Sequence, residues 1–217
     1  MFSISNIIIQ ASINSFGAAT VSGHAAAANI EGFVYAPMNT FHHASLSFTA
    51  QNIGAGKNER INKAVFLSPI CATIVGLTLG LSAYFLGDVL LRLYITESDP
   101  VLLAEIIQKG IERLGTVSAL YFMCGLMDAL SGIIRGAGYS LAPTIINLIG
   151  VCGIRLLWIF TVFAMPQYHT INALLFSYPL TWGLVIVTLI LFYVFAARHG
   201  IKRQCEKNLS YPVDKEN

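Results

Sequence analysis

The stretch INALLFSYPLTWGLVIVTLILFYVFAA, residues 171–197, contains 27 residues and no charged side chain. About 20 apolar residues in a helix suffice to cross the hydrocarbon core of a bilayer, so this stretch is long enough to span a membrane. Three further apolar stretches of 24 to 28 residues occupy residues 64–91, 111–134 and 141–165. Four such stretches predict a polytopic membrane protein.

The composition of the chain indicates the same class of protein. Of its 217 residues, 55% are hydrophobic and only 11% are charged, and the mean hydropathy is +0.67. A soluble domain carries about 25% charged residues, so we expect the surface of this chain to face the lipid bilayer. The net charge is only +2, and no basic run interleaved with aromatic residues precedes the tail. We therefore expect no nucleic-acid partner.

Two less apolar stretches, residues 2–17 and 24–48, complete the expected bundle. The second is rich in Ala, Ser and Asn, which is typical of a helix inside a membrane bundle. The first would form a helix of about 24 Å, short of the roughly 30 Å core, which suggests that the chain begins partway through a spanning helix. We expect an all-α bundle of about six transmembrane helices over residues 1–198, with a truncated first helix, and a tail over residues 199–217.

The distribution of basic residues predicts the orientation of the bundle. If the connections alternate between the two sides, eight Lys and Arg residues lie on one side and three on the other. The eight are Lys57, Arg60, Lys63, Arg135, Arg198, Lys202, Arg203 and Lys207, and the three are Arg92, Lys109 and Arg113. The richer side is the cytoplasmic one by the positive-inside rule. The C-terminal tail is therefore expected in the cytoplasm.

Polar side chains form stripes along the two less apolar helices. Steps of about 3.6 residues lead from Glu31 along one helix face, through Tyr35, Met38, His42, Ser45 and Thr49. In the first helix, Asn6, Gln10 and Asn14 recur at i, i+4 and i+8. Such faces avoid lipid. They either line a water-filled cavity, with Gln10, Asn14, Tyr35 and His42 along its wall, or form interhelical hydrogen bonds.

Three charged residues that lie well away from the ends of the expected helices require a physical reason, because an unpaired charge at the bilayer centre costs at least ~2.5 kcal/mol. They are Glu31, Asp128 and Arg155. At about 1.5 Å per residue, Arg155 lies closer in depth to Glu31, and a pairing with Asp128 is also open. In one interpretation Arg155 neutralises a carboxylate as a fixed strut. In the other, a partly desolvated carboxylate exchanges a proton or binds sodium and couples an ion gradient to movement.

The sequence contains no signature of catalysis or of metal binding. GxSxG, HExxH and phosphate-loop motifs are missing from it, and His42 and His43 have no helical i, i+4 partner of ligand type. We expect no enzyme activity, no metal and no cofactor beyond a sodium ion or proton. An intramembrane catalytic site formed by His42, His43 and Asp128 is disfavoured by their different depths.

Three short segments occur in the order and spacing found in one family of transporters. They are IQASINSFG at residues 9–17, QNIGAGK at residues 51–57, and RGAG at residues 135–138. They resemble, in turn, the end of the seventh helix and the loops after the eighth and tenth helices of multidrug and toxic compound extrusion (MATE) transporters. The motif residues concerned are Gln51, Gly54, Arg135, Gly136 and Gly138.

This resemblance implies a fold and an activity. MATE transporters have twelve helices in two six-helix lobes related by pseudo-twofold symmetry, so the chain would be the C-terminal lobe. It would require an N-terminal lobe from the same polypeptide or from a partner half. The family exports small amphipathic, often cationic compounds in exchange for protons or sodium, by rocking between inward-open and outward-open states. We therefore expect a secondary antiporter of the plasma membrane.

The same resemblance implies roles for individual residues. Asp128 stands in the tenth helix, where the family often places an acidic or polar residue before the Arg-Gly motif. Asp128 and Glu31 are thus expected to be the coupling or substrate carboxylates. Two alternatives remain open. One is a lipid-linked sugar flippase of the same superfamily, which should have a larger and more basic cavity, and the other is a non-transporting truncated half-protein.

Overall fold

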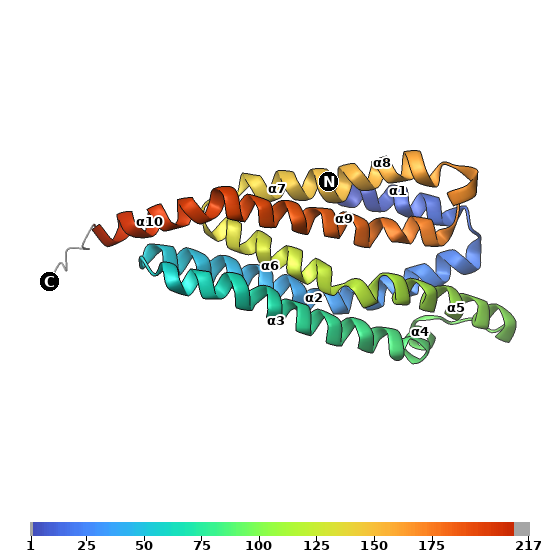
Figure 1. Cartoon of the computed structure of the whole chain (residues 1–217). Helices are drawn as coiled ribbons and strands as arrows, with labels where there is room; N and C mark the ends of the chain where they lie inside the picture. The colour runs from blue at the N-terminus through green and yellow to red at the C-terminus, as the bar shows by residue number, and fades with distance from the viewer. Residues whose placement is uncertain (1, 211–217) are drawn as a thin grey trace.

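A computed structural model describes residues 2–210, and within them the fold consists of helices and short connections without a β-strand. The helices run nearly parallel along one long axis (Figure 1). Within residues 2–210, four helical runs are long and apolar enough to cross a membrane. They are Asn58–Phe85, Pro100–Gly136, Leu141–Phe163 and Ile171–Ser210, one for each predicted apolar stretch. The predicted all-α membrane bundle is confirmed.

One group of helices surrounds the long second helix. The group comprises α2 (Ala18–Gly54), α3 (Asn58–Phe85), α5 (Pro100–Thr116) and α6 (Phe122–Gly136), with the short helix α4 (Gly87–Tyr94) connecting α3 to α5. Helix α2 has 37 residues and continues through Pro37 without interruption. Glycines allow its close packing: Gly23 of α2 faces the backbone of α5, and Gly132 and Gly136 of α6 face backbone carbonyls of α2.

The second group contains the first helix and the C-terminal part of the chain. It comprises α1 (Phe2–Asn14), the rod α7 (Leu141–Asn147), η2 (Leu148–Gly153), α8 (Ile154–Trp158) and η3 (Ile159–Phe163), the turn η4 (Pro166–Tyr168), and the rod α9 (Ile171–Phe192), η5 (Tyr193–Ala197) and α10 (Arg198–Ser210). Segments η2, η3 and η5 are π-helical. Figure 1 shows this group lying alongside the first, and α6 packs against α9 between them.

The predicted helix over residues 111–134 is interrupted. Helix α5 begins earlier, at Pro100, and ends at Thr116, and the 3-10 turn η1 (Ser118–Leu120) separates it from α6. Close packing accompanies the interruption. A Cβ atom on Gly76 of α3 would lie 2.7 Å from the Cα of Phe122, and one on Gly80 would overlap the Ser118 carbonyl. These two glycines let α3 approach the break directly.

Two similar turns close one end of the bundle, which we call the motif end. Gly56 and Gly138 have φ values of 67° and 90°, and the Lys57 and Tyr139 N–H groups donate to the carbonyls of Asn52 and Ile134, five residues back. This is the hydrogen-bond pattern of a Schellman motif, in which glycine is preferred because φ is positive. The segments QNIGAGK and RGAG therefore encode the same kind of helix ending.

The segment expected as a tail continues as helix α10 and packs on the motif end. Ile201 and Cys205 are buried. The Asn208 side-chain amide donates to the Ile53 carbonyl at 2.9 Å, and that of Gln204 donates to the Ala137 carbonyl at 3.4 Å. The membrane-spanning helical run that begins at Ile171 continues through this segment as far as Ser210.

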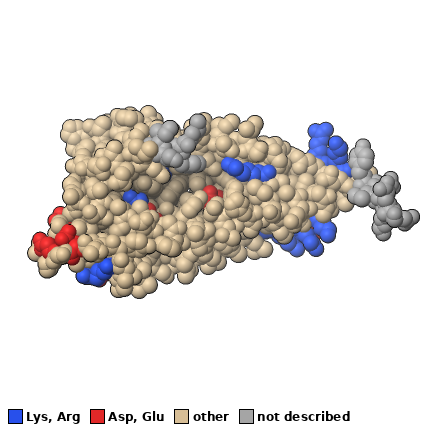
Figure 2. Space-filling model, turned by 180° about the vertical axis from the view of Figure 1, so that it is seen from behind, with Lys and Arg blue, Asp and Glu red and all other residues tan. Residues whose placement is uncertain are grey.

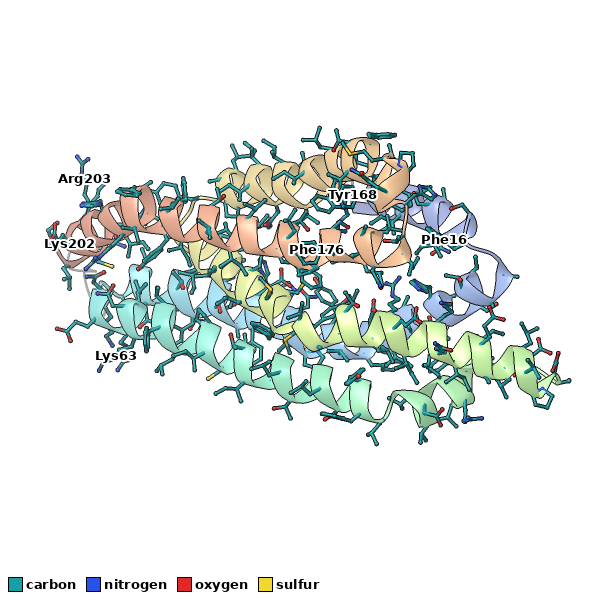
Figure 3. The ribbon with its side chains drawn as sticks, turned by 45° about the vertical axis from the view of Figure 1, so that its right-hand side comes forward. Phe16, Lys63, Tyr168, Phe176, Lys202 and Arg203 are labelled. Atoms are coloured by element: carbon teal, nitrogen blue, oxygen red, sulfur yellow. The ribbon has the colours of Figure 1, made fainter. Side chains whose placement is uncertain are left out.

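Charge and hydrophobicity are distributed as expected for a protein in a bilayer. Large apolar side chains are exposed along α3 and α9, including Phe66, Phe85 and Val187. Lys63, Lys202 and Arg203 lie at the motif end, whereas Phe16 and Tyr168 lie toward the opposite end (Figure 3). Basic side chains also gather at the motif end in the space-filling view (Figure 2). The exposed apolar belt is the surface that lipid would cover.

Candidate functional site

A polar cavity of ≈ 370 Å³ lies between the two groups of helices. Its wall draws on α1, α2, α7, η2, α8 and α9, and on the residues from Tyr121 through α6. The lining residues are Asn6, Tyr35, Asn39, His42, Tyr121, Cys124, Met127, Asp128, Ser131, Arg135, Asn147, Val151, Arg155, Tyr178 and Trp182. Figure 2 shows a hollow in the middle of this face, with acidic and basic atoms inside it.

Asp128 is the carboxylate of this cavity. It lies on α6, and the Tyr35 phenol of α2 is beside it. Its Oδ2 atom is buried and has no hydrogen-bond partner among the described residues, and no basic side chain in residues 6–210 forms an ion pair with it. A carboxylate in this position is available to a proton, a cation or a ligand.

His42 fixes the position of α6 relative to α2. Its Nδ1 atom lies 3.0 Å from the Asp128 carbonyl oxygen and donates to it, so the hydrogen bond joins the two helices beside the carboxylate. Nε2 is then the nitrogen that remains for other partners. Within residues 6–210, no three His, Cys, Asp or Glu side chains come together as metal ligands.

Arg155 is buried in the opposite wall, with only 3% of its surface exposed. Its guanidinium carbon lies 4.1 Å from the centre of the Tyr178 ring, and one terminal nitrogen donates to the Thr181 hydroxyl at 3.3 Å. The Nε atom has no partner in the described structure, and Arg155 has no carboxylate partner there. The π-helical segment η2 ends at Gly153, two residues before Arg155, and such segments often occur near functional sites.

The predicted pairing of Arg155 with Glu31 is wrong. Glu31 forms a two-point ion pair with Arg113, at 2.9 and 2.7 Å, and both side chains are buried. Arg113 was expected in an outer connection. Because α5 begins at Pro100, Arg113 instead lies well inside the helix and faces α2. Glu31 does not line the cavity that contains Asp128.

The polar stripes are divided among several environments. In α2, Tyr35 and His42 line the cavity, whereas Ser45 contacts Ser68 of α3. In α1, Gln10 and Asn14 are exposed and hydrogen-bond to each other at 3.4 Å. They do not line the cavity, so the expectation for these two residues is not met. Asn6, from the same stripe, does line it.

Several lining residues were not among the predicted site residues. Tyr178 and Trp182 are spaced i, i+4 on α9, and the spacing places both on one helix face. The rings of Tyr121 and Trp182 lie 5.4 Å apart, and those of Tyr178 and Trp182 lie 5.9 Å apart. Asn147 donates to Ser131 at 3.3 Å. The polar stripe around Tyr178 and Thr181 in an otherwise apolar helix is the signal that could have indicated them.

Comparison with known proteins assigns the chain to a family. The sequence matches the MatE family model over residues 1–161. The chain belongs to the MATE family. Members of the MATE family are transporters rather than enzymes, and the predicted resemblance is confirmed. The match extends into η3, so it includes Asp128, both Schellman turns and Arg155.

The relatives include three bacterial MATE proteins. The chain is 29% identical to the probable multidrug resistance protein YpnP of Bacillus subtilis over 68% of this chain and 32% of the relative. It is 22% identical to the probable multidrug resistance protein YoeA of the same organism, over 90% of this chain and 41% of the relative. It is 24% identical to the probable multidrug resistance protein NorM of Thermotoga maritima, over 73% of this chain and 32% of the relative. The chain therefore spans less than half the length of these relatives.

A solved structure shares the fold. A MOP superfamily transporter from Pyrococcus furiosus superimposes with a TM-score of 0.69 over 96% of this chain and 49% of that chain, at 18% identity. For that transporter, a reverse polarity of the binding pocket suggests a different function. The chain is thus a multi-pass membrane protein with the fold of about half of a MOP superfamily transporter.

Proposed function

We propose that the chain is one lobe of a secondary antiporter that exports amphipathic compounds in exchange for protons or sodium, with Asp128 as the coupling carboxylate. The observation that carries the proposal is a carboxylate at the wall of a polar cavity, inside a membrane-spanning helix, without an ion pair among the described residues. Carboxylates in such positions commonly serve proton or ion pathways.

The proposed coupling depends on the charge of Asp128. An ionised carboxylate inside a membrane-spanning helix favours hydration, and hence a state in which the cavity is open to water. A proton or a sodium ion neutralises the carboxylate, and the cavity can then close around it. The difference in free energy between the open and closed states therefore changes sign with ion binding, which is what an antiporter requires.

The proposed substrate and partner lobe are inferred from the similarity to the relatives and from the lining of the cavity. The relatives are described as probable multidrug resistance proteins, and the rings of Tyr121, Tyr178 and Trp182 suit the apolar part of an amphipathic compound. A second lobe, in the same polypeptide or in a partner, would complete the path. The motif end would face the cytoplasm. The comparisons do not favour the lipid-linked sugar flippase.

Glu31 receives a different role from Asp128. Both of its oxygen atoms accept hydrogen bonds from Arg113, so it has little capacity left for a coupling ion. We propose that it joins α2 to α5 as a fixed strut.

The test replaces Asp128 with Asn in the complete native polypeptide. We expect D128N to lose most gradient-driven efflux of a fluorescent amphipathic dye from cells, at least tenfold, because Asn neither ionises nor exchanges a proton. The matched control is D88N, since Asp88 is exposed and paired with Arg92 outside the cavity. Unchanged efflux by D128N at equal expression would remove Asp128 from the mechanism.

A further inference from the structure

The charges of the cavity are not balanced. Among the described residues, the guanidinium groups of Arg155 and Arg135 line it, against the single carboxylate of Asp128. Arg135 donates to the Thr144 hydroxyl at 3.0 Å, and its Nε atom has no partner among the described residues. Neither arginine forms an ion pair there. The wall therefore carries an excess of positive charge.

Arg155 is the more deeply buried of the two and is held in a defined position. The Tyr178 ring supports its guanidinium at 4.1 Å and Thr181 accepts one of its N–H groups. An arginine has five N–H donors in a planar fork, so most of them remain for another partner. Burial of a charge without a counter-charge is costly. An anionic group from outside the chain would satisfy this site.

The surroundings of Arg155 also provide an apolar surface. The Tyr178 ring touches the guanidinium, and Trp182 lies next to Tyr178 on the same helix, with Tyr121 beyond it. A ring-containing molecule could lie against these aromatic side chains while its charged end reaches Arg155. Nearby Asp128 would at the same time disfavour a second negative charge at its own side of the cavity.

We infer that the cavity binds amphipathic compounds that carry an anionic group, and that the Arg155 guanidinium holds this group while Tyr121, Tyr178 and Trp182 hold the apolar part. A carboxylate, sulfonate or phosphate matches the planar fork of arginine through paired hydrogen bonds. The inference rests on the proposed transport function and specifies its substrate class, which differs from the often cationic compounds that the family resemblance implies.

The test is equilibrium binding to the purified native polypeptide in nanodiscs of phosphatidylcholine, without an ion gradient. Three probes share a naphthalene ring and differ in charge at pH 7: naphthylacetate is an anion, naphthylalanine a zwitterion and naphthylethylamine a cation. We expect the anion and the zwitterion to bind at least tenfold more tightly than the cation, by calorimetry. Tighter binding of the cation would overturn the inference, and this comparison needs no variant.

Substitutions then assign the preference to Arg155. We expect R155Q to weaken binding of naphthylacetate at least tenfold and to leave naphthylethylamine nearly unchanged. R155K retains the charge but loses the planar fork, so an intermediate affinity is expected, and it serves if R155Q does not fold. R92Q is the matched control, because Arg92 is exposed and outside the cavity. Full anion affinity in both R155Q and R155K would contradict the assignment.

The binding test and the efflux test fail independently. If D128N transports like the unmodified protein while anions bind preferentially, then the coupling proposal is wrong and the substrate class stands. If D128N stops efflux while cations bind best, then the substrate class is wrong and the coupling proposal stands.

Discussion

Glu31 and Asp128 show how the surroundings of a buried carboxylate decide its use. Both are acidic residues inside long helices, and both were expected as coupling or substrate groups. Arg113 meets both oxygens of Glu31, whereas Asp128 faces a cavity with the Tyr35 phenol beside it. Glu31 is therefore fully engaged in an ion pair, whereas Asp128 remains accessible from the cavity. The partner that distinguishes them lies 82 residues from Glu31 in the sequence.

Removal of the charge on Glu31 should destabilise the bundle. E31Q leaves Arg113 buried without a counter-charge, and breaking such a pair costs about 3–5 kcal/mol. We expect a clear fall in the thermal unfolding temperature in detergent, with part of it recovered in the double variant E31Q/R113Q because both charges are then absent. D88N, which breaks an exposed pair, should change little. An E31Q protein as stable as the unmodified one would refute the strut.

At the scale of the helices, small residues determine where the elements approach one another. Gly76 and Gly80 bring α3 against the break between α5 and α6, and Gly132 and Gly136 bring α6 against the carbonyl groups of α2. A Cβ atom on Gly136 would lie 2.5 Å from the Leu46 carbonyl oxygen. In a bilayer, where lipid tails are as apolar as Leu, such close approach is a main source of helix association.

Substitution of Gly76 should therefore loosen the α3 to α6 contact. In G76A the new methyl group would lie 2.7 Å from the Phe122 Cα and 3.1 Å from the Met38 sulfur, and overpacking of this kind costs typically about 1–3 kcal/mol. We expect a lower unfolding temperature in detergent. G32A is the control, since nothing lies within 4 Å of a Cβ atom there, and it should be neutral or slightly stabilising. Equal stability of the two variants would exclude the packing role.

The ends of the helices could be predicted from the sequence only where a helix and an apolar stretch end at the same residue. The starts of the spans over residues 141–165 and 171–197 coincide with those of helical runs, whereas the span over residues 64–91 is shifted from the run Asn58–Phe85 and crosses the break before α4. The start of α5 was expected at residue 111 rather than at Pro100, because Glu105, Gln108 and Lys109 interrupt the apolar pattern of its first turns. The signal was present: Asp99 caps this helix by accepting from the Val101 N–H at 2.9 Å, and Pro100 follows as the first helical residue, a position that proline favours. This error placed Arg113 at the outer end of the predicted span, whereas it lies well inside the helix.

The candidate site was predictable in part for the same physical reason. Asp128, Tyr35, His42 and Arg155 carry polar groups inside apolar or polar-striped helices, and all four line the cavity. Their pairing was not predictable, because it depends on the rotation and depth of helices that are distant in the sequence. Gln10 and Asn14 share a helix face with Asn6 by spacing, yet only Asn6 reaches the cavity.

At the scale of the whole molecule, the structure increases the difference in the number of basic residues between the two ends of the bundle. Eight basic residues were assigned to the motif side and three to the other. Arg113 is now buried in an ion pair, so two of those three, Arg92 and Lys109, remain for the opposite end. By the positive-inside rule the larger excess strengthens the proposal of a cytoplasmic motif end.

Cysteine labelling of the native polypeptide tests this orientation. Ser98 lies in the connection before α5 and Lys207 lies on α10, and both are exposed. We expect a membrane-impermeant maleimide to label S98C on intact cells, and to label K207C only after the cells are permeabilised. The unmodified protein supplies the background from the native cysteines. Labelling of K207C on intact cells would reverse the proposed orientation.

Helix α10 has a mechanical consequence for the cavity. It extends the second group of helices and is fastened to the first group through the Asn208 contact with Ile53 and the buried Ile201 and Cys205. The two groups of helices are therefore joined near the motif end. They are also joined toward the opposite end, where residues 15–17, including Phe16, connect α1 to α2. The continuous helical run from Ile171 to Ser210 therefore links the two groups at the motif end and also lines the cavity through Tyr178 and Trp182.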